Sequence, residues 1–449
     1  MAFTISYLFP TPKFPTPPIY NPSSSGARQV LSLSNFVSKD RNLRILCCLS
    51  LKQSNDQIVT AQDDAVSVDN LRVVFAAGGT GGHIYPAIAI ADQLKLAKPS
   101  SQILFLGTPN SMESASITSA GYDFEHIPAV RLARPILLSL QNLFLPYRLF
   151  KSTVQCLAKL RDFDPHIVIG TGGYVSFPTC LAAAIKGIKL VIQEQNSVPG
   201  VANWVLSHLS DVVFVAFNST VDCFPKGKCV VSGNPVRLSS KKAASKGAAR
   251  FRLFPKSEKI EDPDAKVVLI LGGSLGANAV NIATLNLYHQ MLMEKENLFL
   301  IWQTGVQDFN EMESLVKNHP RLHLTPFMHS MDLAYLAADL VISRAGAMTC
   351  YEILAHGKPS ILIPSPNVSE GHQFKNASLM ADLADAQLIT EDELDSTTLK
   401  TAIEDLLGDE RKMADMSERA LKAAKPNASA EIVQHILSLV HVSSTKKQQ

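Results

Sequence analysis

The fold is decided by residues 72–87, RVVFAAGGTGGHIYPA. After Arg72 comes an apolar run of the kind that parallel sheets bury on both faces. The glycines that follow allow a tight turn, and Pro86 falls where the first turn of a helix tolerates proline. Residues 266–277, KVVLILGGSLGA, repeat this order of strand, glycine loop and helix. The chain is therefore expected to contain two Rossmann-like halves.

Both halves continue with apolar runs that alternate with helical patterns, which is typical of parallel βαβ units. Further strands are expected at 102–107, 166–170, 190–193 and 212–216 in the first half, and at 298–303, 322–325, 340–343, 360–364 and 387–390 in the second. The predicted fold class is α/β, with two Rossmann-like parallel-sheet domains facing across a cleft.

Shifts in composition suggest the domain boundaries. The segment 238–265 is charged and poor in large apolar residues, so it is interpreted as an interdomain linker. It separates an N-terminal domain at 71–237 from a C-terminal domain at 266–425. A last helix within 426–449 is expected to cross back to the N-terminal domain and to end in a tail.

The charge balance excludes one broad class of function. The chain has 42 Lys and Arg against 40 Asp and Glu, which is too even for a general nucleic-acid binder. The seven cysteines show no CxxC spacing, so neither a disulfide framework nor a zinc cluster is indicated. No run approaches the ~18 consecutive apolar residues that a membrane-spanning helix needs.

The first fifty residues differ in composition from the rest of the chain. They contain eight Ser, six Pro and five Lys or Arg, but a single acidic residue, Asp40. Prolines interrupt the apolar residues, which argues against a secretory signal with its continuous apolar block. Residues 1–50 are therefore interpreted as a disordered chloroplast transit peptide, with 51–70 as a linker. An ordinary disordered tail would share this composition and is the alternative.

Glycine loops between a strand and a helix suit phosphate, because backbone amides can approach an anion at the positive end of the helix. GGTGGH at 78–83 is neither the dinucleotide motif GxGxxG nor the P-loop GxxxxGK[ST], so nicotinamide enzymes and ATPases are disfavoured. A third glycine loop, Gly172-Gly173-Tyr174, follows a predicted strand. Three such loops favour phosphate binding over simple tight turns.

A bound metal ion is another way in which a protein can hold a diphosphate. One class of sugar transferase holds a divalent ion with an Asp-x-Asp pair, and this spacing occurs at 162–164 and at 262–264. Both pairs precede a predicted strand, whereas ligands bind beyond the carboxyl ends of parallel strands. They are interpreted as solvated loop carboxylates, and neither a metal nor another cofactor is expected.

Seven motifs occur in the order and spacing of one known family. They are GGTGGHIYPA (78–87), GTGGYVSFP (170–178), QEQNSVPG (193–200), SGNPVR (232–237), GGSLGA (272–277), SRAGAMTCYE (343–352) and EGHQFKNA (370–377). Over about residues 71–425 the chain resembles the bacterial cell-wall glycosyltransferases of the MurG type. The resemblance implies a GT-B fold and an inverting, metal-independent sugar transfer. The implied donor is UDP-N-acetylglucosamine, and the implied acceptor is an N-acetylmuramoyl-peptide on a polyprenyl diphosphate, converted from lipid I to lipid II for peptidoglycan.

His83, directly after the first glycine loop, is the candidate general base of this transfer. An imidazole titrates near neutrality, which suits the removal of a proton from a sugar hydroxyl. A histidine at the start of a helix can also be a simple cap or a satisfied polar residue. Glu194 is the competing base, or else the partner that orients His83.

The resemblance also implies residues that bind the substrates. Arg237 is similar to a diphosphate contact, and Glu352 to the carboxylate that holds the ribose. Gln373 and Asn196 match amides that contact the donor sugar, and Tyr174 is expected to contact the acceptor. The remaining positions belong to the two glycine loops and to segments that meet uracil through main-chain atoms: Thr80, Gly81, Gly82, Ser274, Met328, Ala347, Met348 and Thr349.

A basic and apolar segment is the candidate contact with a membrane. Between residues 126 and 161 there is no Asp or Glu, whereas six Lys or Arg are present. Apolar residues recur there at helical spacing before Pro146, which is expected to break or bend the helix. Such a face can lie among lipid headgroups, or it can face the protein core. The expected membrane patch consists of Ile136, Leu140, Phe144, Arg134, Arg148 and Lys151.

Two alternatives to the cell-wall transferase remain open from the sequence. One is a related plastid enzyme that adds galactose from UDP-galactose to diacylglycerol. The other is a non-catalytic descendant that binds nucleotide sugars, although the retention of His83, Arg237, Glu352 and Gln373 argues against it. For the favoured enzyme we expect peripheral attachment to the inner envelope or the thylakoid membrane of the chloroplast.

Overall fold

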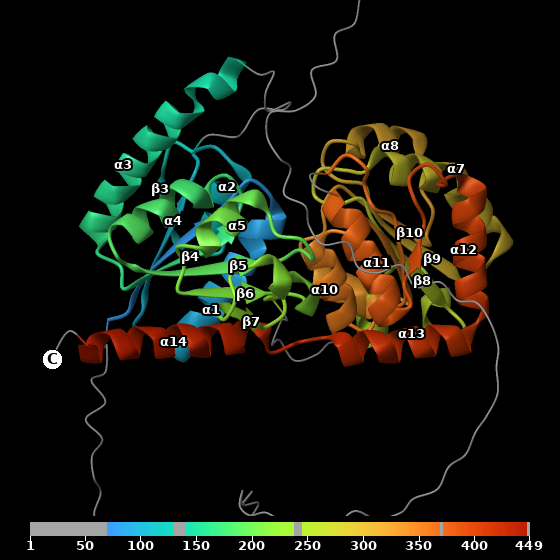
Figure 1. Cartoon of the computed structure of the whole chain (residues 1–449). Helices are drawn as coiled ribbons and strands as arrows, with labels where there is room; N and C mark the ends of the chain where they lie inside the picture. The colour runs from blue at the N-terminus through green and yellow to red at the C-terminus, as the bar shows by residue number, and fades with distance from the viewer. Residues whose placement is uncertain (1–69, 130–139, 238–244, 369–370, 447–449) are drawn as a thin grey trace, which may run out of the picture. The chain divides into compact units, whose positions relative to one another are not determined.

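A computed structural model describes residues 70–129, 140–237, 245–368 and 371–446 (Figure 1). These residues belong to one structural unit. The predicted transit peptide (1–50), nearly all of the linker that follows it, residues 238–244, Arg134 and Ile136 lie outside the described residues.

The N-terminal domain is built on a parallel sheet of seven strands in the order β3-β2-β1-β4-β5-β6-β7. The strands are β1 (Arg72–Ala77), β2 (Gln102–Gly107), β3 (Asp123–His126), β4 (Ile167–Gly172), β5 (Lys189–Glu194), β6 (Val212–Val215) and β7 (Cys229–Val231). The helices are α1 (Gly81–Ala97), α2 (Met112–Ser119), η1 (Leu140–Phe144), α3 (Leu145–Phe163), α4 (Ser176–Ile185), α5 (Val201–Ser207) and η2 (Asn218–Cys223).

The C-terminal domain repeats this plan with six parallel strands in the order β10-β9-β8-β11-β12-β13. The strands are β8 (Lys266–Leu271), β9 (Leu298–Gln303), β10 (Leu322–Thr325), β11 (Leu340–Ser343), β12 (Ser360–Leu362) and β13 (Gln387–Leu388). The helices of this domain are α6 (Lys246–Leu253), η3 (Glu258–Glu261), α7 (Asn278–Glu294), α8 (Phe309–Leu315), α9 (Met331–Ala337), α10 (Ala347–Ala355), α11 (His372–Ala384), α12 (Ser396–Gly408) and α13 (Glu410–Ala423). The last helix, α14 (Ala428–Lys446), follows them in the chain.

Every strand that the apolar runs predicted is present, with ends that differ by at most two residues. The prediction of two Rossmann-like parallel-sheet domains is thus confirmed. β3 and β7 were not predicted. Both are short edge strands, and edge strands bury less surface and so need no continuous apolar run.

The first sheet is covered by helices on both faces (Figure 1). Because side chains alternate along a strand, Val73 and Phe75 of β1 lie in one core with α1 and α14, whereas Val74 and Ala76 lie in the opposite core with α3, α4 and α5. The apolar residues of both faces are needed, which explains the unbroken run in β1.

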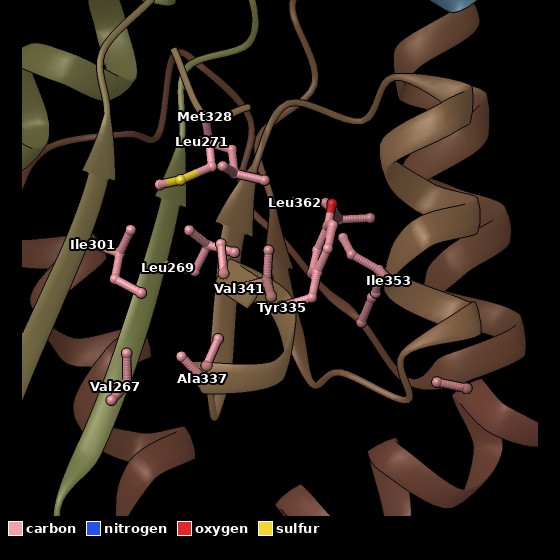
Figure 2. Packing of buried hydrophobic residues seen from close by; sticks show 14 of the residues in the cluster. Val267, Leu269, Leu271, Ile301, Met328, Tyr335, Ala337, Val341, Ile353 and Leu362 are labelled. Atoms are coloured by element: carbon pink, nitrogen blue, oxygen red, sulfur yellow. The ribbon is translucent and has the colours of Figure 1, made fainter. Parts of the chain in front are cut away.

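The second sheet buries its strands in the same way. Figure 2 shows one of its two cores, in which Val267, Leu269 and Leu271 of β8 share one face with Ile301 and Val341 from the neighbouring strands. Val268 and Ile270 lie in the other core, so β8, the strand before the second glycine loop, is packed tightly on both faces.

The predicted linker is wrong over residues 246–265, which belong to the C-terminal domain. Ala249, Phe254 and Ile260 lie in the core of the second sheet. Arg250 is 7% exposed, and its guanidinium contacts Asp339 Oδ2 at 2.6 Å. The charged composition suggested an exposed linker, but part of this charge is buried in an ion pair. Three buried apolar side chains are enough to attach the segment to the core.

Helix α14 returns to the N-terminal domain (Figure 1). Ile432, Val433, Ile436 and Val440 share the core that contains α1, and their helical spacing puts them on one face. The last helix of the chain thus joins the core of the first sheet.

Candidate active site

Many of the predicted site residues lie near the points where the strand order of each sheet reverses. β1 lies between β2 and β4, and α1 and α4 leave the sheet on opposite faces. β8 lies in the same way between β9 and β11. Ligands bind beyond the carboxyl ends of parallel strands at such points. The glycine loops after β1, β4 and β8 all start there.

The loops after β1 and β4 touch each other through their backbones. Gly173 has a φ of +79°, and a Cβ on it would lie 2.1 Å from the carbonyl oxygen of Gly78. The ring of Tyr174 covers Gly79, where a Cβ would lie 3.0 Å from its Cε1. Glycine is required at these positions because any side chain would push the two loops apart.

The loop after β1 leads directly into α1. Thr80 is the N-cap and is exposed, and its side chain accepts no hydrogen bond from the first turn. The amides of Gly81 and Gly82 at the positive end of this helix are thus available to an anion or to sugar oxygens.

His83 lies in the first turn of α1, and its imidazole is held on one side only. Its Nδ1 lies 3.0 Å from the carbonyl oxygen of Thr171 and 2.9 Å from Gln195 Oε1. Thr171 Oγ1 in turn donates to the His83 carbonyl oxygen at 2.8 Å. No described residue forms a hydrogen bond with Nε2. The side chain is half-buried, so Nε2 is the nitrogen left for a substrate.

Glu194 forms no hydrogen bond with His83, so the expectation that it orients the imidazole is wrong. The residue is buried, and its two carboxylate oxygens accept four hydrogen bonds. The donors are the backbone N and Nδ2 of Asn196, the backbone N of Gly200 and Nδ2 of Asn203, at 2.8–3.1 Å. Glu194 therefore organises the loop after β5.

Gln303, at the end of β9, forms a hydrogen bond with the second glycine loop. Gln303 Nε2 donates to the carbonyl oxygen of Gly273 at 2.9 Å, and the backbone N of Met328 donates to Gln303 Oε1 at 3.0 Å. The Gln303 side chain thereby connects the loop that contains Ser274 and the main chain of Met328 to the carboxyl end of β9. The Met328 side chain lies in the core near Leu271 (Figure 2), so a ligand can meet only its main chain.

Ala347, Met348 and Thr349 form the first turn of α10, whose N-cap residue, Gly346, provides no side-chain cap. Glu352 lies one turn further on, and Tyr335 OH donates to its Oε2 at 3.0 Å. Burial raises the pKa of Glu352 to about 7, and the charge of Asp332 adds to this effect while the Tyr335 hydrogen bond opposes it. Its carboxyl group therefore titrates near neutral pH.

Helix α11 connects the donor-side motif EGHQFKNA to the loop after β5. Gln373 Oε1 accepts from the backbone N of Ser365 at 2.8 Å, which leaves its Nε2 to donate. Asn376 is buried and accepts from the backbone N and the Oγ of Ser197 at 3.1 and 2.8 Å. Asn196 Oδ1 lies 3.5 Å from Asn376 Nδ2. Gln373 and Asn196 thus belong to segments that the structure brings together.

Arg237 is held by an acidic residue of α1. Its Nε contacts Asp92 Oδ2 at 2.7 Å, and Tyr122 OH donates to Asp92 Oδ1 at 2.6 Å. Asp92 lies about 16 Å along α1 from Gly81, at about 1.5 Å per residue. A contact between Arg237 and a diphosphate would require this ion pair to open.

The two Asp-x-Asp pairs lie where the sequence placed them, just before β4 and β8. Asp164 ends α3 and pairs with Arg72 at 2.6 Å, and Asp262 accepts from the backbone N of Asp264. Within the described ranges no group of three His, Cys, Asp or Glu residues could hold a metal ion.

The end of η1 and the start of α3 present large apolar side chains to solvent. Phe144, Tyr147 and Phe150 are 60%, 67% and 67% exposed and share one face by their spacing. The expectation that Pro146 breaks or bends the helix is wrong. Pro146 lies in the first turn of α3, where proline is tolerated. Arg148 and Lys151 are exposed, and Leu140 lies in η1. No helix in the described part of the chain is long and apolar enough to cross a bilayer.

Four contacts of the site were not predicted from the sequence: Thr171, Gln195, Gln303 and Tyr335. Gln195 lies inside the QEQN motif, between Glu194 and Asn196, which were both singled out, so the motif itself was the available signal. Gln303 and Tyr335 carry no such signal, because they act from the ends of β9 and α9 on loops that are distant in sequence.

Two family models match the chain. The glycosyltransferase family 28 N-terminal domain matches residues 73–215, and the glycosyltransferase family 28 C-terminal domain matches residues 267–434.

Curated relatives and solved structures agree with these matches. The chain is 40% identical over 376 residues to the UDP-N-acetylglucosamine–N-acetylmuramyl-(pentapeptide) pyrophosphoryl-undecaprenol N-acetylglucosamine transferase of Flavobacterium psychrophilum, covering 83% of this chain and 99% of that protein. It is 38% identical over 367 residues to the transferase of the same name from Salinibacter ruber, covering 82% and 96%. The crystal structure of Acinetobacter baumannii MurG matches with a TM-score of 0.62 and 29% identity, covering 82% of this chain and 99% of that one.

Proposed function

Since the chain belongs to glycosyltransferase family 28, we propose that it transfers N-acetylglucosamine from UDP-N-acetylglucosamine to an N-acetylmuramoyl-peptide on a polyprenyl diphosphate. This is the transfer that the names of its curated relatives describe, and it converts lipid I to lipid II in the synthesis of peptidoglycan precursors.

One observation carries the proposal to this chain. His83 stands beside the touching loops after β1 and β4, with Nδ1 held by two oxygens and Nε2 without a partner among the described residues. A protein that only bound nucleotide sugars would have no use for an oriented base at this point. A transferase needs one, because a sugar hydroxyl is a weak nucleophile until its proton is removed.

The transfer can be written with each group in a role. His83 Nε2 takes the proton of the acceptor hydroxyl, whose oxygen then bonds to the anomeric carbon of N-acetylglucosamine. The bond between that carbon and the diphosphate oxygen breaks, and UDP leaves with the electron pair. Attack from the face opposite to UDP inverts the configuration at this carbon.

The leaving diphosphate needs positive potential on the donor side. The N-cap residues of α7 and α10, Ala277 and Gly346, provide no side-chain cap, and both helices begin beyond the carboxyl edge of the second sheet. Their amides, together with Ser274, can therefore meet the charge that develops on UDP. Glu352 can accept hydrogen bonds from the ribose, and Gln373 Nε2 can donate to the sugar.

The choice of donor and acceptor tests this proposal against the galactolipid alternative. The full chain is incubated with each combination of UDP-N-acetylglucosamine or UDP-galactose and a muramoyl-diphosphate lipid or diacylglycerol. We expect product only from UDP-N-acetylglucosamine with the muramoyl lipid. Product from UDP-galactose and diacylglycerol would establish the alternative instead.

The acceptor is lipid-linked, so we also propose that the protein docks on a membrane through the exposed face of α3. The argument rests on the exposed Phe144, Tyr147 and Phe150 with Arg148 and Lys151 beside them. Aromatic rings suit the headgroup layer, and each cation near an anionic surface contributes about 1 kcal/mol.

Replacing Phe144, Tyr147 and Phe150 with Gln is expected to abolish binding to anionic vesicles. Because the side chains are exposed, the free energy of unfolding should change by no more than about 0.5 kcal/mol per residue. Vesicle co-sedimentation and thermal unfolding measure the two effects. The control replaces Met293 and Leu315, exposed apolar residues of the C-terminal domain, with Gln. Loss of stability in the α3 variant, or equal loss of binding in the control, would contradict docking through α3.

Turnover is expected to survive removal of divalent ions by EDTA. The reason is that helix amides and side chains can stabilise the leaving diphosphate in place of a metal. Turnover is measured with acceptor in detergent, so that an effect of the ions on vesicles cannot contribute. Complete loss with EDTA, restored by magnesium or manganese, would show that a metal acts in the reaction.

The acid-poor, Ser- and Pro-rich composition of residues 1–50 supports a further proposal, that the protein acts in a plant chloroplast, on the inner envelope or thylakoid membrane. A fluorescent protein carrying residues 1–70 is expected to enter chloroplasts of plant cells. A fusion that carries residues 71–140 instead serves as the control and should stay outside. A cytosolic or secreted pattern for the first fusion would refute the proposal.

A further inference from the structure

We infer that Gln195 is a positioning residue for this transfer, which holds His83 in the tautomer whose Nε2 carries no hydrogen. The inference rests on the proposed function, because the tautomer matters only if His83 removes a proton. It follows from which atoms around the imidazole can donate and which can only accept.

The first step is the orientation of the Gln195 amide. Its Nε2 lies 2.7 Å from the carbonyl oxygen of Thr171 and 3.2 Å from the carbonyl oxygen of Gln193. Backbone carbonyls only accept hydrogen bonds, so the NH₂ group must point toward them. Gln195 Oε1 must therefore point toward His83 Nδ1, at 2.9 Å.

The second step is the tautomer of His83. Both atoms beside Nδ1, Gln195 Oε1 and the carbonyl oxygen of Thr171, are acceptors. Nδ1 must therefore carry the hydrogen and donate it. In a neutral imidazole the other nitrogen then keeps its lone pair. Nε2 is thus ready to accept a proton before any substrate arrives.

The third step is the rigidity of Gln195 itself. One of the two hydrogens on Gln195 Nε2 is shared between the carbonyl oxygen and Oε1 of Gln193. Gln193 Nε2 donates to Asn234 Oδ1 at 3.0 Å, and Asn234 Nδ2 donates back to the carbonyl oxygen of Gln195 at 2.9 Å. All three side chains are at most 1% exposed. Buried amides are costly unless they are bonded, and a closed network of bonded amides allows one arrangement only.

The residues of this network come from two of the sequence motifs. QEQN supplies Gln193 and Gln195, and SGNP supplies Asn234. The carboxylate of the first motif, Glu194, accepts its four hydrogen bonds from donors other than His83. His83 therefore has a neutral acceptor as its partner, which orients the ring without stabilising its protonated form as a carboxylate would.

The tautomer can be measured without any turnover. The full chain is labelled with ¹⁵N-histidine, and the His83 signals are assigned by their absence in His83→Gln. We expect a hydrogen on Nδ1 and none on Nε2 in the wild type. Gln195→Met keeps the length but neither donates nor accepts. It leaves the Thr171 carbonyl oxygen as the single acceptor beside Nδ1, so a fraction of His83 should appear with the hydrogen on Nε2. A wild type with the hydrogen on Nε2, or an unchanged tautomer in Gln195→Met, would overturn the inference.

Kinetics then separate positioning from a merely structural role. Gln195→Met is expected to lower kcat by roughly 10²-fold, the usual effect of a misplaced catalytic group, while KM for UDP-N-acetylglucosamine changes by no more than about twofold. In Gln195→Glu a carboxylate replaces the neutral acceptor and stabilises the imidazolium, so the acid limb of the kcat profile should move to higher pH. Gln290→Met, at an exposed position of α7, is the matched control and should change neither kcat nor the acid limb of its pH profile.

The outcomes are distinguishable. If Gln195→Met does not fold, as judged by circular dichroism, Gln195→Glu decides through its pH profile. An unmoved acid limb in Gln195→Glu would mean that Gln195 is structural only. If the wild type shows no transfer, the proposed function fails, and the tautomer of His83 still tests the inference.

Discussion

Replacing His83 with Ala is expected to lower kcat by roughly 10²–10⁴ while the Kd for UDP changes little. The range is that of a lost general base. The affinity should be kept because the imidazole is held by Thr171 and Gln195 of the N-terminal domain, whereas the residues proposed to bind UDP belong to the C-terminal domain. Steady-state turnover and calorimetric titration with UDP measure the two quantities.

His289→Ala is the matched control for this variant. His289 is an exposed histidine of α7, so both turnover and UDP affinity should be retained. If His83→Ala weakened UDP binding as much as it reduced turnover, His83 would be a binding residue. Wild-type turnover in His83→Ala would exclude it as the base.

The second large effect is expected at Glu352. Glu352→Gln should weaken UDP-N-acetylglucosamine binding by roughly 1–3 kcal/mol, because the ribose hydroxyls lose a charged acceptor. The wild-type affinity should also depend on pH, since burial raises the pKa of Glu352 to about 7. Below this value the carboxyl group is protonated and accepts less well; above it the carboxylate is present. Affinity should therefore rise between pH 6 and 8, by at most about tenfold.

The pH dependence identifies the residue. Both phosphates of a nucleotide sugar are esterified and do not titrate near pH 7, so the dependence should vanish in Glu352→Gln. Glu313→Gln, an exposed acid of α8, should keep the wild-type profile. A rise in affinity with pH that persisted in Glu352→Gln would assign the titration to another group and remove Glu352 from ribose binding.

The sheet strands were predictable because two-sided burial leaves a direct trace in sequence. Runs such as VVFAA after Arg72 must be apolar on both faces, and no other element of this length has that requirement. β3, DFEH, has no such trace, because an edge strand packs against one neighbour only. Residues 246–265 were misassigned for the opposite reason, since Arg250 hides its charge against Asp339 in the core.

The site was predictable as a set of motifs but not as a set of contacts. Glu194 and Gln195 are neighbours at the end of β5, and successive side chains of a strand point to opposite faces. Which of them meets His83 depends on the register between β4 and β5, which the motif does not contain. Arg237 is a similar case, because a long side chain after β7 can reach several acidic groups and here meets Asp92.

The helix behind the membrane proposal shows how one residue can be interpreted in two ways. Pro146 breaks a helix from within but is well suited to its first turn. The structure starts α3 at Leu145, so the exposed apolar face continues beyond Pro146 to Tyr147 and Phe150. The described part of the patch is therefore further along the chain than the sequence indicated.

The most direct test of the central claim is the mass of the product. The full chain, with His83→Ala in parallel, is incubated with ¹³C-labelled UDP-N-acetylglucosamine and a muramoyl-peptide polyprenyl diphosphate. We expect the wild type to add one labelled N-acetylhexosamine to the muramoyl lipid, with inverted configuration at the transferred carbon, and the variant to add almost none. An acceptor of unchanged mass with active donor and intact protein, or a product formed equally by His83→Ala, would contradict the account.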